Sequence, residues 1–158
     1  MTEVIIGDVK KFAVRLKLEV RDGEFVSGQV CYVIGNTQWG CFEEKTLLTD
    51  FITASSDASR LCGDNFSQQL WDMGPNEAFY AIYRSIYMES DEIADAGNFD
   101  ITPNISPFDD VFIFEVKNGK YSRFICRNGS EEIRSIDLYE VSVNGVLVEV
   151  WRTISQYN

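Results

Sequence analysis

Carboxylates are concentrated in one stretch of this sequence, and their spacing points to electrostatic binding chemistry. No Lys or Arg occurs between Arg84 and Lys117, yet eight acids do. These acids are Glu89, Asp91, Glu92, Asp95, Asp100, Asp109, Asp110 and Glu115. The rest of the chain nearly balances, with 14 Lys and Arg against 17 acids, so this stretch supplies most of the net charge of −11. A concentrated field of one sign speeds association with a partner of the opposite sign.

The same stretch predicts a long surface loop over residues 89–110, in which Gly97, Pro103 and Pro107 would interrupt any regular element. Loops longer than about 12–15 residues are uncommon in compact domains and are often functional. Aromatic residues lie among the acids, and such residues are enriched at interface hot spots. The predicted partner-binding residues are Glu89, Asp91, Glu92, Asp95, Phe99, Asp100, Phe108, Asp109 and Asp110. A loop that only keeps the protein soluble is the alternative interpretation.

Catalysis and metal binding have little support in the sequence. Histidine is absent, which removes imidazole acid–base chemistry, His-activated nucleophiles and histidine metal sites. The four cysteines, Cys31, Cys41, Cys62 and Cys126, lack C-x₂-C spacing, and we expect them to be small buried apolar residues. The acidic loop also lacks the D-x-D-x-D-G spacing of a calcium loop. We therefore expect no catalytic residue, no metal and no cofactor, with a His-free enzyme that uses paired carboxylates as a minor alternative.

The overall charge restricts the class of partner. With a sequence pI near 4.4, the chain is repelled by nucleic-acid phosphates and anionic membranes, which bind proteins through Lys and Arg. No apolar run approaches the roughly 20 residues that span a bilayer, and the N-terminus lacks the basic and apolar regions of an export signal. We therefore expect a cytoplasmic protein with a basic protein partner, and no nucleic acid, membrane or small-molecule substrate.

Alternating apolar and charged residues predict a β-meander near the N-terminus. Residues 12–21 place their apolar side chains on one face and charges on the other, which is typical of an antiparallel strand. Asp22-Gly23 turns the chain into a return strand over residues 25–34. A further turn leads to a short strand at residues 39–42.

Two helices are predicted next. Apolar residues with a 3.6-residue period begin at Lys45 or Thr46 and end near Gly63. The second helix runs from Pro75, a favoured first-turn residue, to Tyr87.

The C-terminal third contains the Asn-Gly hairpin signals Asn118-Gly119, Asn128-Gly129 and Asn144-Gly145 between β-branched and aromatic runs. The four predicted strands cover residues 111–116, 121–126, 133–143 and 146–154. The sequence has no evident linker, so we expect a single domain over residues 1–158. Its predicted class is α+β, in which two helices pack on an antiparallel sheet made of the three-strand and four-strand meanders.

The N-terminal third resembles a known family. The similar segments are residues 6–19, 28–36 and 40–50, which contain a Gly-Asp turn, a Phe-Ala-Val strand and a Thr-Leu pair before a helix. This pattern is similar to that of the immunity protein 42 family of bacterial polymorphic-toxin systems. Val9 stands where the family pattern has proline, and Gly35-Asn36 replaces its Asn-Gly turn. The matched positions are strand, turn and helix-start residues, so they imply a fold and a role but no site residues.

The resemblance implies a small cytoplasmic protein that binds and silences a toxin encoded beside it, often one used in contact-dependent growth inhibition. Its partner would be the C-terminal domain of the cognate toxin, and the inhibition would be stoichiometric and not enzymatic. Toxin domains of this kind are commonly nucleases with cationic clefts, which an acidic loop could occupy in place of phosphate. The alternative is an acidic adaptor or chaperone-like module for another basic protein.

Overall fold

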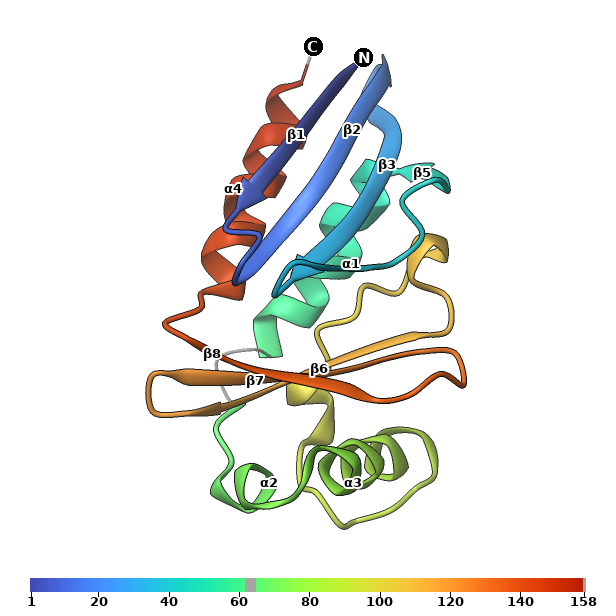
Figure 1. The fold of residues 1–158 in the computed structure, drawn as a ribbon. Coiled ribbons are helices and arrows are strands. Elements are labelled where there is room, and N and C mark those ends of the chain that lie inside the picture. Colours follow the sequence, from blue (N-terminus) through green and yellow to red (C-terminus); the bar gives the residue numbers. More distant parts are fainter. Residues whose placement is uncertain (62–64, 158) are drawn as a thin grey trace.

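The computed structural model of the chain describes residues 1–61 and 65–157 (Figure 1). The fold class is α+β, as predicted. Among these residues the two predicted meanders form two separate antiparallel sheets instead of one, and there are four α-helices instead of two. Figure 1 shows a larger sheet backed by two helices, and a smaller sheet between this layer and the other two helices. Cys62 and Gly63, the predicted end of the first helix, lie outside the described residues. Within the described ranges, no helix is long and apolar enough to cross a membrane.

The larger sheet contains five strands. They are β1 Thr2–Gly7, β2 Phe12–Asp22, β3 Phe25–Ile34, β4 Thr37–Trp39 and β5 Lys45–Leu47. The order is β1-β2-β3-β4, and β5 pairs with the other end of β3. The predictions for β2 and β3 are confirmed. The third strand of the meander lies at β4 and not at residues 39–42, and β1, which pairs with β2 along its length, was not predicted.

Two helices, α1 Leu48–Leu61 and α4 Val143–Gln156, lie behind the larger sheet (Figure 1). The helix predicted from Lys45 or Thr46 begins later, at Leu48, because the three residues before it form β5.

The prediction of a strand over residues 146–154 is wrong, because this segment belongs to α4. Asn144-Gly145 lies in the first turn of that helix, where the Ser142 hydroxyl accepts a hydrogen bond from the Gly145 N–H at 3.1 Å and caps it. The buried residues Val143, Leu147, Val150 and Ile154 follow a helical spacing. Packing of this stripe against the larger sheet outweighs the strand preference of the β-branched residues.

The smaller sheet has the order β6-β7-β8 and one face covered by two helices. Its strands are β6 Val111–Asn118, β7 Tyr121–Asn128 and β8 Arg134–Tyr139, and its helices are α2 Gln68–Asp72 and α3 Pro75–Tyr87. The predictions for β6, β7 and α3 are confirmed. The strand expected over residues 133–143 ends at Tyr139, so the C-terminal meander has three strands and not four. The short helix α2 was not predicted.

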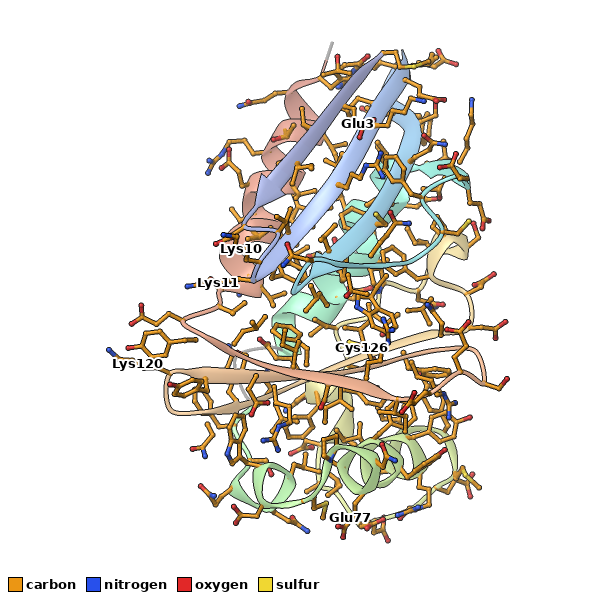
Figure 2. All side chains as sticks on the ribbon, in the orientation of Figure 1. Glu3, Lys10, Lys11, Glu77, Lys120 and Cys126 are labelled. Atoms are coloured by element: carbon orange, nitrogen blue, oxygen red, sulfur yellow. The ribbon has the colours of Figure 1, made fainter. Side chains whose placement is uncertain are left out.

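Side chains of the smaller sheet alternate between two apolar cores. Val111 and Ile113 of β6 pack with the larger sheet, α1 and α4. Phe114 and Val116, on the other face of the same strand, pack with α2 and α3. Cys126 of β7 lies between the two sheets (Figure 2). The smaller sheet is therefore buried on both faces, and residues 89–110 lie beside it.

Candidate functional site

The acidic segment 89–110 runs along one side of the molecule, from the end of α3 past the smaller sheet to the larger sheet (yellow in Figure 1). It contains two short 3₁₀ helices, Ala96–Phe99 and Ser106–Phe108. Backbone hydrogen bonds hold it to β6 and to the segment that follows β4. The Ile101 N–H donates to the Ile113 carbonyl at 3.0 Å, and the Cys41 N–H donates to the Pro107 carbonyl at 2.7 Å. The predicted loop is thus a segment with a defined path.

Three of the predicted acids, Asp100, Asp109 and Asp110, share one pocket; we call them the pocket acids. With Tyr87 and Asn104 they line a cavity of about 410 Å³, whose lining residues include no Lys or Arg. Asp109 and Asp110 are exposed, and Asp100 is half-buried. Three carboxylates around one concave space suit a cationic group, since an opposite charge within a few ångströms favours the ionised carboxylate.

Asp100 is the most constrained of the pocket acids. Its Oδ1 accepts a hydrogen bond from the Thr102 N–H at 2.9 Å, and the Tyr87 hydroxyl lies 3.5 Å from its Oδ2. Burial raises the pKa of Asp100, and the hydrogen bonds from Thr102 and Tyr87 oppose that rise. Burial, followed by the nearby charge of Asp100, raises the pKa of Tyr87 to about 12. The Tyr87 hydroxyl therefore keeps its proton at neutral pH and can donate toward Asp100.

The other four predicted acids, Glu89, Asp91, Glu92 and Asp95, are exposed and do not line the pocket; we call them the outer acids. Glu92 forms an ion pair with Arg84 at 2.9 Å on the surface, which offsets part of their charge. The outer acids therefore add to the long-range field of this side of the molecule without shaping the cavity.

The two aromatic residues predicted as contact residues are packed inside the protein. Phe99 is 4% exposed in the core beside α3, and Phe108 is 3% exposed in the core beside the larger sheet. The rings of Phe108 and Tyr32 pack in a T-shaped arrangement, with centroids 5.0 Å apart. Both rings are thus buried in the protein's own cores, where they hold the acidic segment in place, and Phe108 also lines the pocket. A contact of Phe99 or Phe108 with a partner stays a prediction.

Glu115 is the eighth acid of the stretch, and it is fully buried in β6. Asn65 Nδ2 donates to Glu115 Oε1 at 2.7 Å and to the Glu115 carbonyl at 3.3 Å. Oε2 has no hydrogen-bond partner in the described part of the chain. Burial raises the pKa of Glu115, and the charge of Lys117 opposes that rise. The surface field is therefore weaker than the sequence count of eight acids predicts.

We expect Glu115→Gln to stabilise the protein more at pH 7 than at pH 4. The folded-state pKa of Glu115 lies above its ordinary value of 4.5, so the folded protein loses stability as the pH rises through that raised pKa. A glutamine cannot ionise and avoids this loss. Urea unfolding of both proteins at the two pH values measures the difference, and an equal effect at both would contradict the expectation.

Some residues of the pocket were not predicted as contact residues. Tyr87, Asn104 and Phe112 line it beside the acids. Tyr87 ends α3 and its ring is 52% exposed, while Phe112 belongs to β6. Their positions in the sequence give only one signal, the place of Tyr87 at the start of the acidic stretch. The packing of α3 against β6 brings Tyr87 and Phe112 together at the pocket, where their ring centres lie 5.9 Å apart, and Asn104 comes from the acidic segment itself.

The thiols in the described ranges differ in their surroundings. No three His, Cys, Asp or Glu side chains are grouped there as a metal ion requires. Burial raises the pKa of Cys31 to about 12, and burial also raises the pKa of Cys126, so both thiols stay protonated. The burial of these two cysteines was predicted correctly, whereas Cys41 is exposed.

Comparisons with known proteins agree with this fold. The solved structure of CdiI from Burkholderia dolosa AUO158 is similar with a TM-score of 0.76 and 15% sequence identity, over 95% of this chain and 99% of that chain. At this identity the similarity concerns the fold. No curated protein sequence matches the chain. A family model described as Immunity protein 42 matches residues 1–153, a range that includes all of the pocket acids. This match extends the resemblance seen in the N-terminal third, and the chain belongs to the immunity protein 42 family.

Proposed function

We propose that this chain binds the toxic C-terminal domain of a cognate bacterial toxin and neutralises it in a stoichiometric complex. Membership of an immunity-protein family supports this role. The observation that carries the binding mode is the pocket of about 410 Å³ lined by Asp100, Asp109 and Asp110 without a Lys or Arg in its lining. A protein that inhibits its target by binding to it needs a preformed surface and no catalytic group.

A basic toxin of the nuclease type is the partner that fits this surface best. Nucleases hold phosphates with Lys and Arg side chains, and carboxylates can take the place of those phosphates. Asp109 and Asp110 are exposed and can accept hydrogen bonds from such side chains. The complex would form in the cytoplasm, the compartment in which a toxin of this type meets its substrate.

We expect the purified chain to form a one-to-one complex with the toxin domain encoded beside its gene, with an association rate that falls steeply as salt rises. Exposed charges steer the encounter, and salt screens them over about 8–10 Å at ordinary ionic strength. Calorimetry gives the stoichiometry, and stopped-flow mixing from about 0.02 to 0.5 M NaCl gives the rates.

A toxin activity assay with increasing amounts of the chain separates neutralisation from mere adaptor binding. Loss of activity at one equivalent supports the proposed function. The absence of a complex, or a complex that leaves the toxin fully active, would overturn it. If the complex forms at a rate that does not depend on salt, only the electrostatic part of the proposed function is overturned.

A further inference from the structure

Two arginines of β7 lie on the same face of the smaller sheet but have different surroundings. Arg123 forms a two-pronged ion pair with Asp137 of β8, at 2.7 and 3.0 Å, and also donates to the Trp71 carbonyl at 2.9 Å. Arg127 is four residues further along and points to the same side, toward α3. β8 begins opposite Cys126, so no β8 residue stands opposite Arg127.

Arg127 is surrounded by aromatic rings. Its guanidinium carbon lies 4.7 Å from the ring centre of Phe79, 5.3 Å from Phe112 and 5.7 Å from Tyr83. In the described part of the chain, no carboxylate pairs with Arg127, and its buried Nε has no hydrogen-bond acceptor. This is unusual in a chain with a net charge of −11. Rings that stack on the face of a guanidinium hold it in one orientation and leave its terminal N–H groups for a planar acceptor.

The aromatic rings connect Arg127 to the acidic pocket. Tyr83 and Phe112, which contact Arg127, also pack against Tyr87, with ring centres 5.0 and 5.9 Å from that of Tyr87. Tyr87 and Phe112 line the pocket. Tyr80 and Tyr87 are 43% and 52% exposed on the same helix. Trp, Tyr and Arg are the residues enriched at interface hot spots, so two of these three types meet on this surface.

We propose that Arg127 is a second anchor for the protein partner and pairs with a carboxylate on that partner. The proposal rests on the proposed function and adds to it the chemistry of the partner. The matching surface would present a cation to the pocket acids and an Asp or Glu to Arg127, on either side of a patch that packs against Tyr83 and Tyr87. Opposite charges at two fixed points exclude partners that carry only one of them.

The test uses the toxin domain encoded beside the gene and three variants of the full chain. Arg127→Gln removes the charge, and Arg127→Lys keeps the charge and the ring contacts but loses the planar fork. Lys120→Gln is the matched control, because it removes one charge at the turn between β6 and β7, the opposite end of β7 from Arg127 (Figure 2). Calorimetry gives the affinity, and thermal unfolding shows that each variant is folded.

We expect Arg127→Gln to weaken binding by about 30-fold or more and Arg127→Lys by about 3- to 10-fold, with Lys120→Gln within about 2-fold of the wild type. Equal affinities for Arg127→Gln and Lys120→Gln would overturn the inference and leave the proposed function intact. If the wild-type chain does not bind the toxin domain, both are overturned.

A double-mutant cycle identifies the partner group and remains decisive if Arg127→Gln fails to fold. Each surface Asp and Glu of the toxin domain is changed to Asn or Gln, and its effect is measured against the wild type and against Arg127→Lys. One carboxylate should weaken binding to the wild type clearly more than binding to Arg127→Lys. Additive effects for every carboxylate would overturn the inference and leave Arg127 a packing residue.

Discussion

Changing Asp109 and Asp110 together to Asn is expected to weaken binding of the toxin domain by about 2–5 kcal/mol, because truncating one side of a desolvated charge pair leaves the partner's charge unpaired. Asn suits both positions, since it has nearly the same shape as Asp and tolerates the positive φ of 60° at Asp110. Calorimetry on the folded double variant measures the loss. Asp100 is left unchanged because its Oδ1 holds the Thr102 N–H.

Two further double variants separate the pocket from the general field. Asp91→Asn with Asp95→Asn removes two outer acids and should mainly slow association at low salt. The control is the double variant Glu24→Gln with Glu77→Gln, which removes two exposed acids outside the acidic segment. Glu77 lies on α3 and points away from the smaller sheet (Figure 2), so this variant should have little effect on toxin binding. If all three double variants bind equally well, the interface lies outside the acidic segment.

Phe108→Ala is expected to lower the free energy of unfolding by about 3–5 kcal/mol, which is the usual cost of truncating a buried Phe. Phe108 is 3% exposed, and its ring centroid lies 5.0 Å from that of Tyr32. The ring also lies against Gly40, where an added Cβ would come within 3.1 Å of it. Its loss leaves a cavity beneath the segment that carries Asp109 and Asp110. Urea unfolding monitored by circular dichroism measures the change.

Phe66→Ala is the matched control for this variant. Phe66 is 58% exposed, and its truncation should cost well under 1 kcal/mol, as exposed substitutions usually do. If Phe108→Ala were as mild as the control, the acidic segment would not depend on this contact for its position.

The elements predicted best are those in which a local pattern and the tertiary structure agree. The alternation in β2 coincides with a buried face, where Leu16 and Leu18 are at most 2% exposed. Pro75 fixes the start of α3 because it occupies the first helical turn. The prediction fails at α4, since Asn144-Gly145 and the valines that follow favour a hairpin locally. The helix forms because Ser142 caps it and its apolar stripe completes a core made by distant strands.

The candidate site could be predicted only in part. The sequence shows that the acids cluster, but two acids of equal appearance in the sequence differ in the fold: Asp109 is exposed and Glu115 is fully buried. Burial depends on which side of β6 a residue faces and on what packs there. The surroundings of Arg127 could not be identified in advance. Among the residues that the structure describes, Arg127 has no carboxylate partner because β8 starts opposite Cys126, one residue short of it.

Inward and outward residues alternate closely within the acidic segment, and this has an evolutionary consequence. Phe99, Ile101 and Phe108 are buried, while their neighbours Asp100 and Asp109 face the pocket. Under the proposed function, mutations at the outward positions would change which toxin is recognised, while the inward positions preserve the path of the backbone. As a toxin diverges, its immunity protein could therefore regain binding by point substitutions in this segment, with every intermediate sequence still able to fold.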